Sequence, residues 1–243
     1  MNDFNDWDAT LDVWKSGQIL LPKVTRWKKY TKDEDTDGGG IVQNTLEHSY
    51  SLALLGEILL LSLGKYEPNY DHKLFLTACL LHDHGEGELE RDVLYIDKEP
   101  DGHVNEYIAF KQRFSTLKTE VYESLEQAFL LQFARLEKAE IARFPKQAQE
   151  QIEYLQTNKQ KEALAFEALE RWDYVLYALE QYKERRNEKI LVQVLRNQIP
   201  ELNKLASLMP GFEEEVWTKK ARDWFEQFVE ERNGKWIEQK GEM

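Results

Sequence analysis

The chain has 243 residues, of which 42% are hydrophobic, and it carries a formal net charge of -13. That length allows one large helical domain with a sizeable core, and the acidic balance disfavours polymeric nucleic acid as a partner, because a phosphate backbone needs a basic surface. The only cysteine, Cys79, excludes an internal disulfide and a cysteine-rich zinc site.

In the first third of the chain, helical periodicity recurs and nothing alternates strongly enough to predict a sheet. We expect helices at about Trp7–Ile19, Asn44–Gly64 and Asp71–His82. A capping box of Asn44 and Glu47 would open the second helix. A basic segment and a charged loop ending at Gly40 precede that box. Gly85 and Gly87 are expected to break the chain just after His82-Asp83. His84 is expected to be exposed, with a contact to a metal ligand or to substrate as the alternative.

The rest of the chain is also predicted to be helical, with segments at about His103–Ala142 in one or two pieces, at Pro145–Lys161 in part, and at Lys161–Arg185. Pro200 and Pro210 are expected to bracket a short segment. The last helix aligns Trp217, Ala221, Trp224 and Phe228 on one face. That face suits either docking within the chain or a dimer interface.

These elements predict an all-α, single-domain helical bundle over residues 1–243, with a core at about 14–180 and a peripheral C-terminal helical extension at about 187–243. The N-terminus has no secretory pattern. Uninterrupted apolar runs such as Ile58–Leu61 and Tyr174–Leu179 are too short to cross a bilayer. We therefore expect a soluble cytoplasmic protein without a membrane partner.

Polar side chains of the metal-binding type stand on helix faces that are otherwise apolar. His48 is in line with Leu52, Leu55, Leu59 and Leu63. His82 shares a face with Phe75, Ala78 and Cys79, and Asp83 follows it. Asp173 lies in a stripe with Phe166, Leu169 and Leu176. Because a buried charge is costly unless it is paired or binds a metal, the pattern predicts one metal site formed by His48, His82, Asp83 and Asp173.

The order of these four residues resembles the metal-binding pattern of the HD-domain phosphohydrolase superfamily. Glu47-His48-Ser49, His82-Asp83-His84-Gly85-Glu86 and the upstream Arg26-Trp27 resemble its 5'-deoxynucleotidase branch, whose members remove phosphate from deoxynucleoside monophosphates. The resemblance covers about Trp14 to Leu179 and implies an HD-type fold and a homodimer. It favours Co or Mn as the metal, while mixed nitrogen and oxygen ligation also admits Fe, Ni, Zn or Mg.

The resemblance also implies roles for single residues. Glu86 would orient or deprotonate the attacking water, with Glu88 as the alternative. Arg26 would hold the phosphate through its planar fork, and Trp27 would pack against the sugar or help exclude a ribose 2'-hydroxyl. Asp92 would bind the sugar hydroxyl, although it stands one residue later than the family's Asp, so the spacing leaves the preference for deoxyribose open.

The leading expectation is a metal-dependent enzyme that hydrolyses a (deoxy)nucleoside 5'-monophosphate, with a small-molecule nucleotide as its partner. One alternative is an HD-type phosphodiesterase or pyrophosphohydrolase that acts on a cyclic nucleotide or a guanosine polyphosphate. Another is a non-catalytic helical interaction module that holds a metal. A nuclease is disfavoured by the acidic charge.

Overall fold

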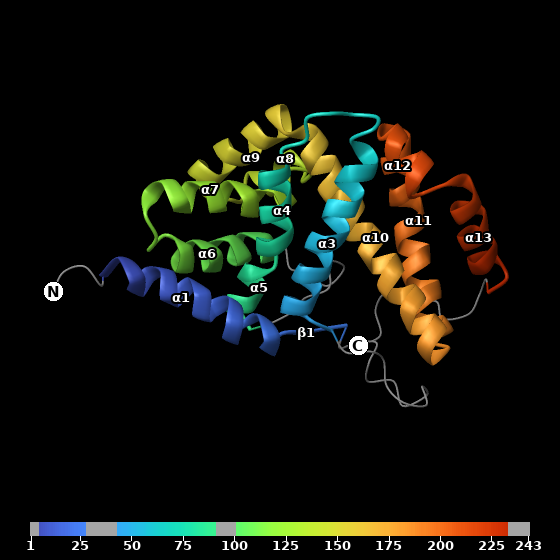
Figure 1. The fold of residues 1–243 in the computed structure, drawn as a ribbon, viewed down its shortest axis with the longest axis horizontal. Helices are drawn as coiled ribbons and strands as arrows, with labels where there is room; N and C mark the ends of the chain where they lie inside the picture. Colours follow the sequence, from blue (N-terminus) through green and yellow to red (C-terminus); the bar gives the residue numbers. More distant parts are fainter. Residues whose placement is uncertain (1–4, 28–42, 91–100, 233–243) are drawn as a thin grey trace. The chain divides into compact units, whose positions relative to one another are not determined.

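The computed structural model describes residues 5–27, 43–90 and 101–232, and Figure 1 shows its ribbon. Helices form nearly all of the regular structure, so the all-α prediction is confirmed. The strands among the described residues are β1 (Thr25–Arg26) and β2 (Gln43–Asn44), which pair antiparallel with Thr25 opposite Asn44. This ladder is too short to show as alternation in the sequence. The predicted loop ending at Gly40 lies outside the described residues.

The described residues fall into two compact units. The first contains residues 5–27, 43–57 and 70–167, and the second contains residues 58–69 and 168–232. Two helices contribute residues to both units: α3 (Thr45–Leu63) and α10 (Gln160–Arg185). The predicted single domain, with its core at about 14–180, stays a prediction.

The remaining helices of the first unit are α1 (Asn5–Ile19), η1 (Leu21–Lys23), α4 (His72–Leu81), α5 (His84–Glu88), α6 (Gly102–Phe114), α7 (Thr119–Leu130), η3 (Leu131–Phe133), α8 (Lys138–Ile141) and α9 (Lys146–Asn158). The expectation of one or two helices over His103–Ala142 is wrong, because this stretch forms α6, α7, η3 and α8. The chain reverses after Phe114 so that α7 packs on α6 (Figure 1).

A column of aromatic rings forms the centre of this unit. Phe110 stacks on Phe114 and on Phe129, with ring centroids 4.2 and 4.1 Å apart. Phe129 meets Phe133, and Phe133 meets Phe144, both at angled geometries. Such contacts add about 0.5–1.5 kcal/mol each beyond the burial of apolar area. The reversal between α6 and α7 is therefore fixed by rings from both helices.

The start of α3 is fixed by its capping box, as predicted. The Glu47 backbone N–H donates to Asn44 Oδ1 at 2.9 Å, and the Asn44 N–H donates to the Glu47 carboxylate at 3.1 Å. By length and composition alone, α3 could cross a membrane, a test that core helices of soluble proteins also pass. No uninterrupted apolar run indicates this in the sequence, because polar residues such as Ser51 and Glu57 divide the apolar stretches of α3. The cytoplasmic location stays a prediction.

The start of α4 is held by Asp71, which caps the helix and joins it to the segment before α10. Asp71 Oδ1 accepts from the Leu74 N–H at 3.0 Å, and Oδ2 pairs with Lys159 Nζ at 2.7 Å. The Asp71 N–H donates to buried Glu162 at 2.8 Å. The hydrogen bond from Lys159 lowers the pKa of Asp71, against a smaller opposing effect of burial.

The second unit contains α11 (Glu188–Leu208), α12 (Pro210–Glu215) and α13 (Lys219–Glu230). The expectation that Pro200 and Pro210 bracket a short segment is wrong. Pro200 lies inside α11, and Pro210 occupies the first turn of α12, where its missing N–H costs little. An interior proline costs about 3 kcal/mol. In α11, buried residues on both sides, such as Leu195 and Leu202, offset that cost.

The apolar face of α13 differs in part from the predicted one. Trp224 is 45% exposed, whereas Phe225 and Phe228 are buried. Phe225 stacks on Trp217 at 5.5 Å, and Phe228 meets Tyr182 edge-on. Since α13 packs on α11 within the unit, its buried face serves docking within the chain rather than a dimer. The homodimer stays a prediction.

Replacing Asp71 tests how the start of α4 is held. Asp71→Ala should lower the free energy of unfolding by about 1 kcal/mol through loss of the cap. Asp71→Asn keeps an accepting oxygen but loses the charge that faces Lys159, so it should cost less. Because the folded-state pKa of Asp71 is lowered, the advantage of wild type over Asn is present at neutral pH. It should be lost as the pH falls below 3.8 and passes through that lowered pKa.

Urea unfolding of the three proteins at neutral and acidic pH measures these differences. An Asp71→Asn variant that matches wild type at neutral pH would show that the ion pair adds nothing.

Candidate metal centre

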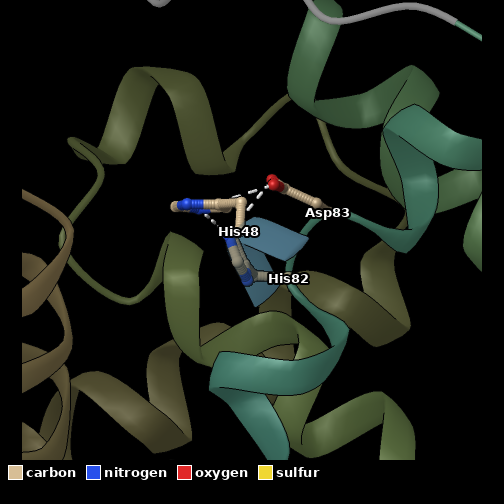
Figure 2. Close-up of side chains that lie close together, drawn as sticks. All are labelled: His48, His82 and Asp83. Atoms are coloured by element: carbon tan, nitrogen blue, oxygen red, sulfur yellow. Dashed lines mark hydrogen bonds and ion pairs between the residues drawn. The ribbon is translucent and has the colours of Figure 1, made fainter. Parts of the chain in front are cut away.

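Two imidazoles and one carboxylate meet in the interior of the first unit. His48, His82 and Asp83 are all buried, and one ligand atom from each lies within 4.8 Å of the others. His48 Nε2 lies 3.2 Å from His82 Nε2 and 3.7 Å from Asp83 Oδ2, and His82 Nε2 lies 3.2 Å from Asp83 Oδ1. Figure 2 shows the three side chains converging from α3 and from the end of α4. Three of the four predicted ligands are thus brought together.

The separations between these atoms suit a metal ion. Ligand atoms bound about 2.0–2.1 Å from one ion lie about 2.8–3.4 Å apart, with neighbours in octahedral geometry at the short end and those in tetrahedral geometry at the long end. Two of the three separations are 3.2 Å. Imidazole nitrogen with carboxylate oxygen is a donor set for divalent transition metals. The cluster therefore fits such an ion, while the donor atoms alone do not select which metal.

The turn between α4 and α5 brings His82 and Asp83 to the same point. Adjacent residues of a regular helix point about 100° apart. Here α4 ends at Leu81, Asp83 leaves helical geometry at φ -92° and ψ 3°, and α5 starts at His84. The interruption therefore falls at the ligand pair itself, which lets both side chains face His48.

The helix is interrupted at His82-Asp83 as expected, but the glycines are not the cause, since Gly85 and Gly87 both lie inside α5. They are small because α5 packs closely on its neighbours. A Cβ at position 85 would lie 2.5 Å from the backbone oxygen of Glu106, and one at position 87 would lie 2.5 Å from Leu21 Cδ2. The glycines thus permit close packing on α6 and η1.

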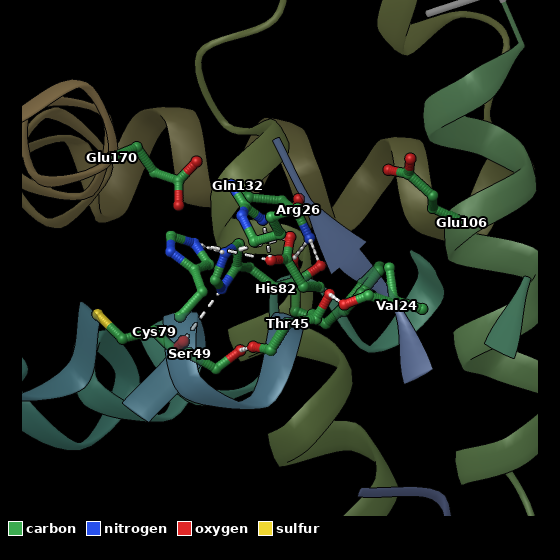
Figure 3. A network of polar contacts seen from close by, with 12 residues as sticks. Val24, Arg26, Thr45, Ser49, Cys79, His82, Glu106, Gln132 and Glu170 are labelled. Carbon is green, nitrogen blue, oxygen red and sulfur yellow. Dashed lines mark hydrogen bonds and ion pairs between the residues drawn. The ribbon is translucent and has the colours of Figure 1, made fainter. Parts of the chain in front are cut away.

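His82 is oriented by groups on both sides of its ring. Its Nδ1 lies 3.0 Å from the carbonyl oxygen of Cys79, and a carbonyl can only accept, so Nδ1 carries the proton. With Nδ1 as the donor, Nε2 is the ring atom that faces the cluster and that would supply a lone pair to a metal. Phe166 meets the ring edge-on at 5.7 Å. Figure 3 shows this contact with Cys79 among the polar contacts around the cluster.

His48 is placed by the first turn of α3. The Thr45 N–H donates to the Val24 carbonyl at 3.0 Å, which ties this turn to the segment carrying β1. The Ser49 hydroxyl donates to the Thr45 carbonyl at 2.9 Å (Figure 3). His48 then follows one turn after the cap and is fully buried, on the same face as buried Leu52 and Leu59. The apolar stripe predicted this position.

Arg26 contacts the cluster directly. Its Nη1 lies 2.5 Å from Asp83 Oδ2, and both residues are buried. Burial alone would raise the pKa of Asp83, but His82 and Arg26 outweigh it and hold the pKa well below the usual value. Asp83 is therefore ionised at neutral pH. The resemblance predicts that Arg26 binds the substrate phosphate, and the structure shows that it pairs with Asp83, a predicted metal ligand.

The structure describes the positions of Glu86, Trp27 and Asp173, but not that of Asp92. Glu86 is buried on α5, three residues after Asp83. Trp27 is buried and has a left-handed backbone (φ 63°) that bulky residues rarely adopt. Asp92 lies outside the described residues. Asp173 is a buried residue of α10 in the second unit, and its role as fourth ligand stays a prediction.

Glu88, the alternative to Glu86, is held in a separate network. Its Oε1 accepts from Ser16 at 2.5 Å and from Arg113 Nε at 2.9 Å, and its Oε2 accepts from Arg113 Nη2 at 3.0 Å. These bonds join α1, α5 and α6. Such a two-pronged pairing with arginine is typical of a carboxylate that holds structure together.

Two residues near the cluster were not found from the sequence. His84 was expected to be exposed, but α5 packs so closely on α6 that it is buried edge-on against Phe114. Burial lowers its pKa to about 4, so the ring is neutral at pH 7. Gln132 donates to the backbone carbonyl of His82 at 2.8 Å. Nothing in the sequence around Gln132 indicates that contact.

Comparisons with models of protein families, with curated proteins and with solved structures found no match to this chain. The fold and the buried cluster are therefore described from the structure alone, and the resemblance to HD-type enzymes rests only on the pattern of residues.

Substitution of Gly85 tests the close packing of α5. Gly85→Ala should cost about 1–3 kcal/mol of unfolding free energy, because the backbone of Glu106 has to move. Gly17→Ala is the matched control, since its Cβ would meet only His84 Cε1, at an ordinary 3.7 Å. Alanine inside α1 should instead stabilise the protein by roughly 0.5–1 kcal/mol. Urea unfolding decides between them, and equal stability of the two variants would contradict the packing argument.

Proposed function

We propose that the chain is a metal-dependent phosphohydrolase of the HD type, which removes phosphate from a (deoxy)nucleoside 5'-monophosphate. The observation that carries the proposal is the buried meeting of His48, His82 and Asp83. Buried polar groups of this kind are costly to keep unless they bind something. The residue pattern around them supplies the reaction class.

In this proposal His48, His82, Asp83 and Asp173 hold one divalent metal, with Co or Mn favoured. Such an ion supplies Lewis-acid stabilisation of phosphoryl charge and lowers the pKa of water. The Asp83 carboxylate has an oxygen for each of two partners, because Oδ2 pairs with Arg26 and Oδ1 faces His82. The Arg26 pair then orients the carboxylate, as hydrogen-bonding partners of metal ligands commonly do.

Glu86 is proposed as the general base. It takes a proton from the water whose oxygen forms the new bond to phosphorus, while the bond from phosphorus to the 5' oxygen breaks. The leaving oxygen takes up a proton, so the products are nucleoside and inorganic phosphate. The burial of Glu86 on α5, within one turn of chain after Asp83, supports this role.

Arg26 is proposed to contact the substrate phosphate as well as Asp83. A guanidinium has five N–H donors in a planar fork, so a bond from Nη1 to Asp83 is compatible with a second bond to a phosphoryl oxygen. Trp27 follows it directly, and its left-handed backbone is a strain of the kind that concentrates at functional sites. These two residues would place the phosphate and the sugar of a small nucleotide.

The activity itself is the first test. Phosphate release from each (deoxy)nucleoside monophosphate with Co²⁺ or Mn²⁺ should be detectable and should stop on chelation. His82→Ala should lower kcat/KM by about 100-fold or more. His72→Ala is the matched control, because His72 lies on the same helix, is exposed and pairs only weakly with Glu57 at 3.7 Å. It should retain full activity.

The same assay separates the alternatives. Turnover of cyclic nucleotides or guanosine polyphosphates, with none of monophosphates, would move the proposal to a phosphodiesterase or pyrophosphohydrolase. Metal binding without any turnover would leave a non-catalytic metal-binding module.

Asp173→Ala tests the fourth ligand. Loss of a carboxylate ligand should weaken Co²⁺ binding by about 100-fold and abolish turnover, since outer-shell losses alone cost 10–100-fold. Glu180→Ala, an exposed change on the same helix, should do neither. Titration with Co²⁺ followed by visible absorption measures the affinity. Unchanged affinity in Asp173→Ala would remove Asp173 from the site.

A further inference from the structure

We infer that Gln132 is a positioning residue for the metal centre, because it holds the peptide that joins His82 to Asp83. The inference rests on the proposed metal site and adds a residue that the sequence pattern does not contain. Gln132 lies on η3, and its side-chain amide Nε2 donates to the His82 carbonyl oxygen at 2.8 Å. That carbonyl belongs to the peptide group between the two ligands.

The end of a helix creates the need for such a donor. The last carbonyls of a helix have no N–H partner from a following turn. α4 stops at Leu81, His82 keeps helical dihedrals as its C-cap, and Asp83 departs from them, so nearby carbonyls accept from side chains instead. Cys79 accepts from the His82 ring, and His82 accepts from Gln132 (Figure 3).

The side-chain amide of Gln132 is itself held in place by the packed core. The same Nε2 lies 3.1 Å from the carbonyl oxygen of Phe129, at the end of α7. Phe129 stacks on Phe110 in the aromatic column, and α7 packs on α4. The amide therefore links the ends of α4 and α7, and the peptide plane of the ligand pair is set by the packed core.

Rotation of this peptide would move both ligands together. The peptide is planar, so turning its carbonyl away from Gln132 changes ψ of His82 and φ of Asp83 at once. Donor atoms 3.2 Å apart would lose their common point. Loss of Gln132 should thus weaken the metal site more than it weakens the fold.

The decisive measurement is Co²⁺ affinity and the visible absorption spectrum of the bound ion. Gln132→Met keeps the length of the side chain and removes the N–H donor. It should raise the Kd for Co²⁺ by about tenfold or more and alter the spectrum, in the range known for outer-shell partners. Gln132→Ala should act in the same direction, and serves if the Met variant folds poorly by circular dichroism.

Gln156→Met is the matched control. Gln156 is also a part-buried amide that donates to a backbone carbonyl, that of Leu136 at 3.1 Å, on an element that carries no predicted ligand. Its variant should bind Co²⁺ within about twofold of wild type. Both Met variants should lower the thermal midpoint, and Gln132→Met somewhat more, because it loses bonds to two carbonyls and Gln156→Met loses one, each worth about 1 kcal/mol.

The outcomes separate this inference from the proposed function. If wild type binds Co²⁺ and folded Gln132 variants bind it with unchanged affinity and spectrum, Gln132 has no positioning role and the metal site stands. If wild type binds neither Co²⁺ nor Mn²⁺, the proposed metal site fails and this inference fails with it.

Discussion

The ionised carboxylate of Asp83, held away from water, is the constraint on which the centre of the first unit depends. An isolated buried carboxylate would cost several kcal/mol. Arg26 from β1, His48 from α3 and the adjacent His82 all turn their nitrogens towards it. Segments far apart in the chain must therefore meet at one point. The short β1–β2 ladder places Arg26 there, and the anchored first turn of α3 places His48 there.

A broken helix supplies the rest of the geometry. Between α4 and α5 the chain gives up regular hydrogen bonds to aim two neighbouring side chains at one centre. The loss is limited because the carbonyls of Cys79 and His82 find side-chain donors. Aromatic rings pack on both sides of the break, since Phe166 meets the His82 ring and Phe114 meets the His84 ring. The centre is thus a local departure from helical regularity within a tightly packed core.

Features set by neighbouring residues could be predicted from the sequence. The capping box at Asn44 and the buried stripe around His48 follow from residues within one or two turns, so the sequence alone indicates them. Pro200 shows the opposite case, because tertiary burial keeps α11 intact where a local rule predicts its end.

Contacts between distant segments were beyond such patterns. Arg26 stands 57 residues before Asp83, and Gln132 stands 50 residues after His82. Side chains of these types serve many purposes on a protein surface, so only the folded chain assigns them partners. The metal cluster was within reach because its members also break an apolar stripe, whereas the groups that orient them leave no local signal.

The two glycines of α5 leave different routes open to evolution. At position 87 the obstacle is the flexible end of the Leu21 side chain, so a shorter residue at position 21 would make room for a Cβ. At position 85 the obstacle is the backbone of Glu106, which every amino acid shares. A second change at position 21 could therefore allow Gly87 to be replaced. No side-chain replacement at position 106 could do the same for Gly85, so substitutions should accumulate far more readily at position 87 than at position 85.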